Sequence, residues 1–425
     1  MVLSLNSPPF RFYRRMSIAF HIGLFVCWWA AIQSRELRAD EPAVDFQVQL
    51  DVALQELTSD YCWFHPRVAS VPDLGKDGNP LVVLTLQKHL GASDHYSALH
   101  YMTSQDLGQT WTKPVLPKQL AWRQGEDGET IGACDVTPGW HAKSQRVLAI
   151  GIQLRYNQAG VQLMDKPRSH DAVYAIYDPQ TDAWTAWQTL DLPMGDAGQF
   201  HQVAPGCGQW LIQDDGSILL PLYYQGPQAG PHSTTVVHAS FDGVTMKYLA
   251  HGDELHLDEV RGLVEPSLTR FHGKYYLTLR NDIRGYVTSS TDGLHFDAIK
   301  PWTFDDGSEL GSYNTQQHWV THRDGLFLAY TRRGANNDHI VRNRAPLFAA
   351  RVDVERLTVL RDTEKVLIPE RGVMLGNFGA AAINQHESWV TDSEFITDGK
   401  VHQRGANACT FIARLKWSQP NRSDK

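Results

Sequence analysis

The chain has 425 residues, a formal net charge of −8 and a pI near 6.2, which excludes the strongly basic profile of a nucleic-acid-binding protein. Apolar residues make up 42% and charged residues 20% of the chain, which excludes an intrinsically disordered protein. The length would suit several ordinary domains, but a single closed ring of β-sheets can also absorb it.

The beginning of the chain differs in composition from the rest. A basic stretch precedes an apolar run from Ile18 to Ile32, which is too short for a membrane-spanning helix of about 20 residues. This pattern predicts a signal peptide over residues 1–39, with cleavage after Ser34 or Ala39. We therefore expect export to the periplasm or the extracellular space, and no membrane contact of residues 40–425.

The cysteines outside the signal segment leave two interpretations open. Their spacing matches no metal site, and they allow three disulfide connectivities among which the sequence does not choose. Buried free thiols fit equally well, since a domain of this size does not need disulfides. The sequence thus predicts neither a metal nor a cofactor. These cysteines are Cys62, Cys134, Cys207 and Cys409.

From about residue 60 onward, short apolar runs alternate with Gly, Pro, Asp and Asn turns, and helical periodicity is almost absent. Pairs such as Asp215-Gly216 and Asp324-Gly325 between two apolar runs are typical of β-hairpins. Recurrent hairpins in an all-β chain indicate a six-bladed β-propeller, which forms one domain over residues 40–425. The six units begin near Arg67, Asp135, Cys207, Glu265, Asn314 and Asn377.

One strand precedes the first unit. Residues Val44 to Val52 have the composition of a strand, and we expect them to pair with the last strand, around Phe411 to Trp417. A ring that is closed by strands from both ends of the chain leaves no exposed sheet edge.

The sharpest motif runs from Ser104 to Trp111 and has the form Ser-x-Asp-x-Gly-x-x-Trp, the Asp box. A shortened copy runs from Ser290 to Phe296, and a more divergent one begins at Ser240. In such a turn the Asp side chain accepts hydrogen bonds from backbone N–H groups, and Gly takes the positive φ. We therefore expect Asp106 and Asp292 to be structural and to lie on the rim of the ring.

With these boxes the chain resembles the sialidase (neuraminidase) superfamily of Asp-box, or BNR-repeat, six-bladed propellers. The resemblance implies an exo-acting glycosidase. It implies that Asp94, ahead of the first box, is the catalytic acid/base, and that Glu265 assists the nucleophile. It also implies substrate binding by Arg67, at the first unit, and by Arg280, which follows Glu265 on the neighbouring strand.

The family's third arginine has several candidates in the fifth unit, namely Arg332, Arg333, Arg342 and Arg344. Arginines that grip a carboxylate do so through bidentate, charge-assisted hydrogen bonds. Alternation along a strand places Arg332 and Arg333 on opposite faces, so at most one of these two points inward. Of the four candidates we prefer Arg333.

The chain departs from the family at the nucleophile. A tyrosine is expected where the sixth unit opens, and Phe378 stands there instead. Tyr313 is then the candidate nucleophile. His318 as a second catalytic residue and His141 as a binding residue would suit a different reaction, because a His near Tyr and Arg can remove a proton beside a uronate carboxylate, as lyases do.

Together these features predict a secreted, sialidase-like glycoside hydrolase that acts on an anionic glycan, either sialic-acid-like or uronate-containing. Two alternatives remain: a polysaccharide lyase on a propeller scaffold, and a non-catalytic glycan-binding propeller. In each case the partner is an anionic oligosaccharide or polysaccharide, and we expect a monomer. We also expect Arg67, Glu265, Arg280 and His318 to converge on one end of the central channel.

Overall fold

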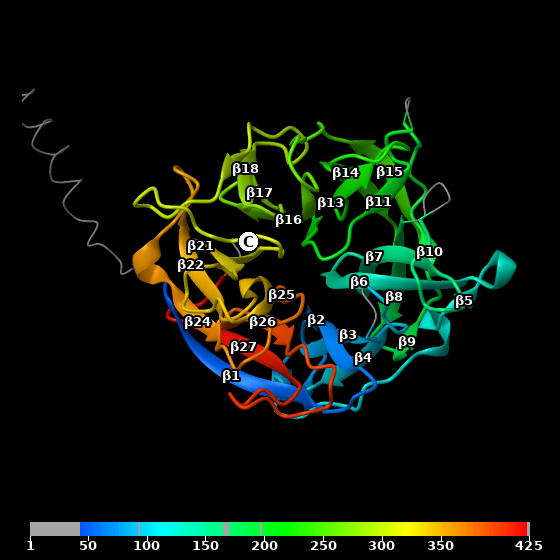
Figure 1. Ribbon diagram of the computed structural model, residues 1–425, viewed down its shortest axis with the longest axis horizontal. Helices are drawn as coiled ribbons and strands as arrows, with labels where there is room; N and C mark the ends of the chain where they lie inside the picture. The colour runs from blue at the N-terminus through cyan, green and yellow to red at the C-terminus, as the bar shows by residue number, and fades with distance from the viewer. Residues whose placement is uncertain (1–42, 92–93, 165–169, 196–197, 423–425) are drawn as a thin grey trace, which may run out of the picture. The chain divides into compact units, whose positions relative to one another are not determined.

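The computed structural model describes residues 43–91, 94–164, 170–195 and 198–422. The predicted signal peptide and its cleavage sites lie outside these residues. Within residues 44–425 the chain forms six antiparallel sheets that follow one another around a central channel (Figure 1). The prediction of an all-β, six-bladed propeller is confirmed. Among the described residues, no helix is long and apolar enough to cross a membrane.

The first three blades, coloured blue to green in Figure 1, follow one another along the chain. Blade 1 consists of β2 (Cys62–Val71), β3 (Leu81–His89) and β4 (His100–Ser104). Blade 2 consists of β5 (Arg123–Gln124), β6 (Thr130–His141), β7 (Arg146–Tyr156), β8 (Asp171–Asp178), β9 (Ala183–Trp184) and β10 (Gln188–Thr189). Blade 3 consists of β11 (Gln202–Ala204), β12 (Leu211–Ile212), β13 (Ile218–Gln225), β14 (Ser233–Phe241) and β15 (Met246–His251).

The last three blades complete the ring. Blade 4 consists of β16 (Val264–Phe271), β17 (Lys274–Arg280), β18 (Tyr286–Ser290) and β19 (Lys300–Pro301). Blade 5 consists of β20 (His318–His322), β21 (Gly325–Tyr330), β22 (Leu347–Asp353), β23 (Thr358–Val359) and β24 (Lys365–Ile368). Blade 6 consists of β25 (Gly379–Asn384), β26 (Glu387–Ser393), β27 (Cys409–Trp417) and β1 (Phe46–Gln55).

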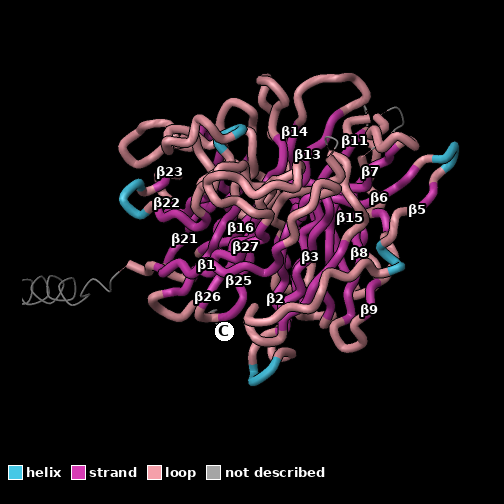
Figure 2. Tube along the Cα trace, turned by 60° about the horizontal axis from the view of Figure 1, so that its bottom comes forward, coloured by secondary structure: helices cyan, strands magenta, loops and turns pink. Residues whose placement is uncertain are grey.

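Helical structure in the described residues is confined to short 3₁₀ turns in the loops, which Figure 2 shows at the ends of the sheets. They are η1 (Lys76–Gly78), η2 (Lys118–Leu120), η3 (Glu126–Gly128), η4 (Val341–Asn343) and η5 (Arg361–Thr363).

The N-terminal strand closes the ring as expected. β1 pairs antiparallel with β27, with Phe46 opposite Trp417 and Val52 opposite Phe411. The Phe46 ring is buried and makes edge contacts with Trp417 and with Phe327 of blade 5. The two ends of the chain therefore hold one sheet together, and the ring closes without a free edge at this point.

The core lies between neighbouring sheets. Leu84 of blade 1 belongs to one apolar cluster with Trp389 and Ile412 of blade 6. Because both faces of such a sheet are covered, its central strands are continuous apolar runs, as in β21, where every residue is buried. This double burial explains why the sequence shows short apolar runs rather than strict alternation.

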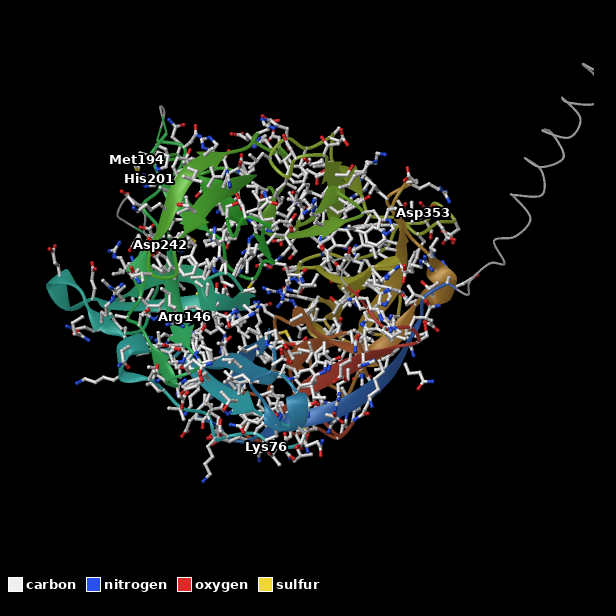
Figure 3. All side chains as sticks on the ribbon, turned by 180° about the vertical axis from the view of Figure 1, so that it is seen from behind. Lys76, Arg146, Met194, His201, Asp242 and Asp353 are labelled. Carbon is white, nitrogen blue, oxygen red and sulfur yellow. The ribbon has the colours of Figure 1, made fainter. Side chains whose placement is uncertain are left out.

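The aspartates of the predicted boxes cap turns away from the channel. The Asp106 carboxylate accepts from the backbone N–H of Thr110 at 2.9 Å, and Asp292 accepts from those of Leu294 and His295, each at 2.8 Å. Asp242 and Asp353 cap two further turns, and Figure 3 shows both at the outer edge of the ring. These side chains have the structural role that the motif predicts.

The inner strands share one backbone feature at the channel mouth. In each of the first five blades, one non-glycine residue with a positive φ lies within the inner strand or in the segment that leads into it. L-residues rarely adopt this conformation, and it concentrates at functional sites. The residues are His65 (φ 53°), Asp135 (φ 54°), Cys207 (φ 57°), Glu265 (φ 45°) and Asn314 (φ 54°).

Candidate functional site

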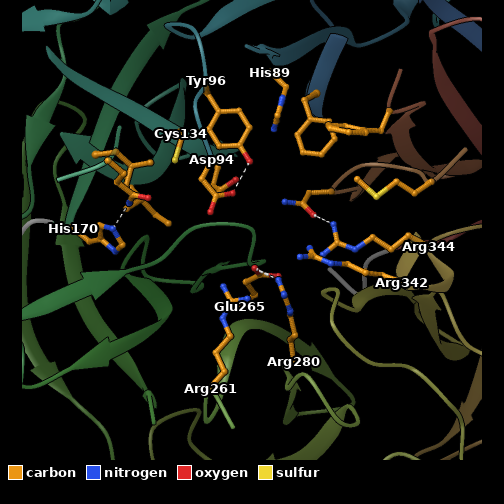
Figure 4. A pocket seen from close by; sticks show the side chains of 18 of the residues that line it. His89, Asp94, Tyr96, Cys134, His170, Arg261, Glu265, Arg280, Arg342 and Arg344 are labelled. Carbon is orange, nitrogen blue, oxygen red and sulfur yellow. Dashed lines mark hydrogen bonds and ion pairs between the residues drawn. The ribbon is translucent and has the colours of Figure 1, made fainter. Parts of the chain in front are cut away.

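A cavity of about 410 Å³ opens at the end of the channel where these five residues lie, and all six blades contribute to its lining. Figure 4 shows the arrangement of its charged side chains, with Glu265 beside Arg261 and Arg280. Arg261, Arg280, Arg342 and Arg344 come from one side, and Asp94 lies across from them.

Arg280 forms a buried ion pair with Glu265, and both residues line the cavity. Arg280 also donates to the side-chain oxygen of Asn314 at 2.8 Å and to Asp282 at 3.3 Å. Burial alone would raise the pKa of the Glu265 carboxyl, but the charge and hydrogen bond of Arg280 outweigh it, so this pKa is lowered. Glu265 therefore remains ionised at neutral pH.

Arg344 lines the cavity without a counter-ion. Its side chain is buried, and its guanidinium donates to the backbone oxygen of Asn314 at 2.6 and 3.2 Å and to the side-chain oxygen of Asn377 at 3.2 Å. Burial, followed by the nearby charge of Arg280, lowers the pKa of Arg344 to about 10. Among the ion pairs of the described residues, none includes Arg344. The cavity wall therefore carries a buried positive charge whose hydrogen bonds, within the described part of the chain, go to neutral oxygens.

The opposite wall carries Asp94, which is exposed to the cavity. Its carboxylate accepts from the hydroxyl of Tyr96 at 3.3 Å, and its backbone oxygen accepts from the hydroxyl of Tyr156 at 2.9 Å. Two buried tyrosines, Tyr96 and Tyr223, also line the cavity, and burial raises the pKa of both well above the ordinary value. Neither is poised to form a phenolate nucleophile at neutral pH.

Beside the cavity, three blades bring together a histidine, an aspartate and a cysteine. One donor atom from each of His65, Asp135 and Cys207 lies within 4.8 Å of the other two. Asp135 lines the cavity, whereas His65 and Cys207 are buried beneath it. Cysteine spacing alone predicted no metal site, and it could not reveal this cluster because each residue comes from a different blade.

Of the eight predicted site residues, the structure brings Asp94, Glu265 and Arg280 together around the cavity. Arg67 and His318 do not join them at the mouth, although both are buried near the channel axis. His318 lies between the hydroxyl of Ser267 at 2.8 Å and the backbone oxygen of Phe378 at 2.9 Å. Burial, with the charge of Arg67, lowers the pKa of His318 to about 3. The expected convergence thus holds for two of the four residues.

Arg67 lies away from the channel mouth because blades 1 and 4 share the same shift in strand pairing. The pairing between β2 and β3 shifts after Phe64, and the pairing between β16 and β17 shifts in the same way after Val264. His65 therefore corresponds to Glu265, which lies at the channel mouth. Arg67 corresponds to Ser267 and lies two residues further along the inner strand, deeper in the channel. There its guanidinium donates to the backbone oxygen of Val136 at 3.4 Å.

His141 lies at the end of β6, in the hairpin turn, rather than at the opening of blade 2. Its ring contacts the hydroxyl of Ser144 at 2.7 Å and the backbone oxygen of Gly216 at 2.9 Å, which links blades 2 and 3. His141 therefore lies outside the cavity lining, away from the arginines with which it was expected to act.

Tyr313 and Arg333 contact each other outside the cavity lining. The Tyr313 hydroxyl donates to the side chain of Asn343 at 2.7 Å, and the exposed Arg333 guanidinium lies 3.9 Å above the Tyr313 ring. Blade 5 instead presents Arg342 and Arg344 to the cavity. Arg344, which follows the 3₁₀ turn η4, therefore lines the cavity, whereas the predicted Arg333 does not.

At the start of the sixth blade, Asn377 faces the cavity and Phe378 does not. The Phe378 ring is fully buried, with its edge against His318 at a centroid distance of 4.9 Å. Among the described residues of blade 6, the cavity lining includes no tyrosine. The four described cysteines are all buried and free.

Comparisons with known proteins address the fold. No family model and no curated protein sequence matches the chain. Among solved structures, the chain is similar to a protein of unknown function from Dyadobacter fermentans, with a TM-score of 0.59 and 16% identity over 88% of this chain and 99% of that one.

Two sialidases are also similar. Trypanosoma rangeli sialidase has a TM-score of 0.56 and 14% identity over 83% of this chain and 55% of its own. The Hadza microbial sialidase Hz136 has a TM-score of 0.58 and 10% identity over 87% of this chain and 68% of its own. The chain thus spans little more than half the length of the Trypanosoma protein. It is a six-bladed propeller of the sialidase type, with an arginine-lined cavity at one end of its channel.

Proposed function

We propose that the protein is an exported glycoside hydrolase that binds an anionic sugar in the cavity at the channel mouth. The observation that carries the proposal is Arg344, a buried arginine beside Arg280 that takes part in no ion pair among the described residues. A buried charge is unfavourable unless it is paired, and burial together with like charge has already lowered the pKa of Arg344. A sugar carboxylate between the two guanidinium groups would supply the missing charge.

Arginine suits this task because its planar guanidinium binds a carboxylate through two parallel hydrogen bonds. Arg261 and Arg342 add positive charge to the same wall. The chain as a whole is negative, so this local concentration of arginines would be needed to attract an anionic sugar.

Two carboxyl groups could perform the hydrolysis. Asp94 would act as the acid and donate a proton to the leaving oxygen, a role that its position across the cavity from the arginines supports (Figure 4). Glu265, which Arg280 keeps ionised, would stabilise positive charge on the sugar or accept a proton from water. Most glycosidases use two carboxyl groups in this way. Such a reaction does not need the tyrosine that the sixth blade lacks.

A panel of glycans tests the proposal. The mature protein is incubated with sialosides, with uronic-acid glycans and with neutral glycans, and the products are separated by chromatography. We expect release of a free anionic monosaccharide, and loss of this release in Asp94→Asn and Arg344→Ala but not in the matched control Arg333→Ala.

Three outcomes would overturn the proposal. Release of neutral sugars only would remove the role of the arginines. An unsaturated uronate product would show elimination rather than hydrolysis. Binding of anionic glycans without any product would show a lectin.

A further inference from the structure

We propose that His65, Asp135 and Cys207 form a binding site for one Zn²⁺ ion beside the cavity. Their donor atoms, an imidazole nitrogen, a carboxylate oxygen and a thiol sulfur, lie within 4.8 Å of one another. Zinc takes all three donor types, with bonds of about 2.0–2.3 Å that place neighbouring ligand atoms roughly 3.3–3.8 Å apart in a tetrahedron. Small side-chain movements would therefore suffice for coordination.

The fold itself creates the cluster. His65, Asp135 and Cys207 hold the same left-handed backbone position in three consecutive blades. Adjacent blades contact each other at their inner strands, so this repeated geometry turns the three side chains toward one point. The side chain of His65 is 1% exposed and that of Asp135 is 18% exposed, so the cluster is interior but reaches the cavity through the aspartate.

Without a metal, the polar atoms of this cluster are not fully paired. The Nε2 of His65 lies 2.9 Å from the Oδ1 of Asp135 and 3.0 Å from the amide nitrogen of Asn377. The Oδ1 of Asp135 and the Nδ1 of His65 are buried without a hydrogen-bond partner among the described residues. Buried polar atoms without a partner are unfavourable.

A cation among the three side chains would give the unpaired Oδ1 of Asp135 a partner, because His65, Asp135 and Cys207 would each direct a lone pair at the metal. The amide nitrogen of Asn377 also lies 3.4 Å from the sulfur of Cys207, to which it would then donate.

The charges of the metal and its three ligands also sum to zero at this site. A zinc ion with one carboxylate, one thiolate and one neutral imidazole is electrically neutral, and the Cys207 thiol releases one proton to solvent on binding. Burial, followed by the charge of Asp135, raises the pKa of this thiol in the absence of a metal, and the positive charge of Arg67 acts in the opposite direction. Three protein ligands leave a fourth position for water, as in catalytic zinc sites. Asp135 lines the cavity, so we place this fourth position on the cavity side.

The proposal is independent of the proposed hydrolase activity, and metal binding tests it directly. The full mature chain is treated with a chelator, dialysed and titrated with Zn²⁺ against a chromogenic zinc indicator. We expect one ion per chain, with affinity lowered about 100-fold or more in His65→Ala and Cys207→Ser. Cys62→Ser is the matched control, since Cys62 is also a buried free thiol and lies on the same strand as His65.

Cobalt gives a second readout, which starts with the wild-type chain. Co²⁺ bound to the wild-type chain should give a thiolate-to-metal charge-transfer band in the near ultraviolet and the visible bands of a tetrahedral site. No stoichiometric zinc binding by the wild-type chain would overturn the proposal. So would a thiolate band that persists in Cys207→Ser and disappears in Cys62→Ser, because the ligand would then be another cysteine.

Discussion

Arg280 and Arg344 meet at the same residue of the cavity wall. The side-chain oxygen of Asn314 accepts from Arg280 at 2.8 Å, and its backbone oxygen accepts from Arg344 at 2.6 Å. Asn314 has a positive φ of 54°, and it thereby offers both of its oxygens to the two guanidinium groups. Two buried arginines are held side by side by a neutral residue, while Glu265 pairs with only one of them.

Arg344→Ala should weaken binding of an anionic sugar with little effect on the fold. A hydrogen bond to a charged group contributes about 1.5–3 kcal/mol, so the dissociation constant should rise about 10- to 150-fold. Isothermal titration calorimetry with the free sugar acid measures this change. Arg333→Ala removes an exposed arginine of the same blade and should leave affinity within twofold of wild type. Equal losses in both variants would argue against a local role for Arg344.

Asp94→Asn should slow turnover far more than it weakens binding. A positioned general acid contributes about 10²- to 10⁴-fold to the rate, and the amide cannot donate a proton of comparable acidity. We expect kcat to fall by that factor while KM changes little, and the limb of the pH–rate profile that reports the acid to disappear. A variant that keeps wild-type kcat would show that Asp94 is not the acid.

Phe378→Tyr should destabilise the protein and create no activity. The Phe378 ring is fully buried, so an added hydroxyl without a hydrogen-bond partner should cost about 1–3 kcal/mol. Urea unfolding monitored by tryptophan fluorescence measures the loss. The half-buried cavity residue Phe395 provides a control, since Phe395→Tyr should cost less. A gain of hydrolysis in Phe378→Tyr would show that this position, rather than Asn377, faces the substrate.

Asp392 should make stability depend on pH. Its carboxyl is fully buried on β26, and burial raises its pKa from the ordinary 3.8 to about 7. Between these values the unfolded chain has lost the proton that the native chain keeps, so stability falls as pH rises through this window. The loss is on the order of 4 kcal/mol at the upper end.

Urea unfolding at pH 4 and pH 8 tests this dependence. Asp392→Asn cannot ionise, so it should be more stable than wild type at pH 8 and about equal to it at pH 4. The exposed Asp398 supplies a control, since Asp398→Asn should keep the wild-type dependence. If Asp392→Asn shows the same pH dependence as wild type, another group is responsible.

The fold could be predicted because its signals are local. Turn pairs such as Asp215-Gly216 precede strands that lie where the apolar runs predict them, and β13 begins two residues after this pair. Closure by β1 followed from the need to cover a sheet edge. Glu265 and Arg280 could also be found, because they lie on adjacent strands of one hairpin.

The rest of the site depends on contacts between blades, which no local pattern encodes. Strand alternation distinguishes Arg332 from Arg333 but says nothing of Arg344, which lines the cavity only after the turn η4. The family motif points to Arg67, whereas the likeness of His65-Pro66 to Glu265-Pro266 indicates that His65 is the residue at the mouth. The meeting of His65 with Cys207 requires the closed ring.

One matched pair of substrates tests the central claim most directly. The turnover of a sugar acid glycoside is compared with that of its methyl ester, which has the same ring and leaving group but no charge. If Arg280 and Arg344 bind the carboxylate, kcat/KM should favour the acid by about 10- to 150-fold in wild type, and Arg344→Ala should remove most of this preference. Equal kcat/KM values for the acid and the ester in the wild-type protein would contradict the account.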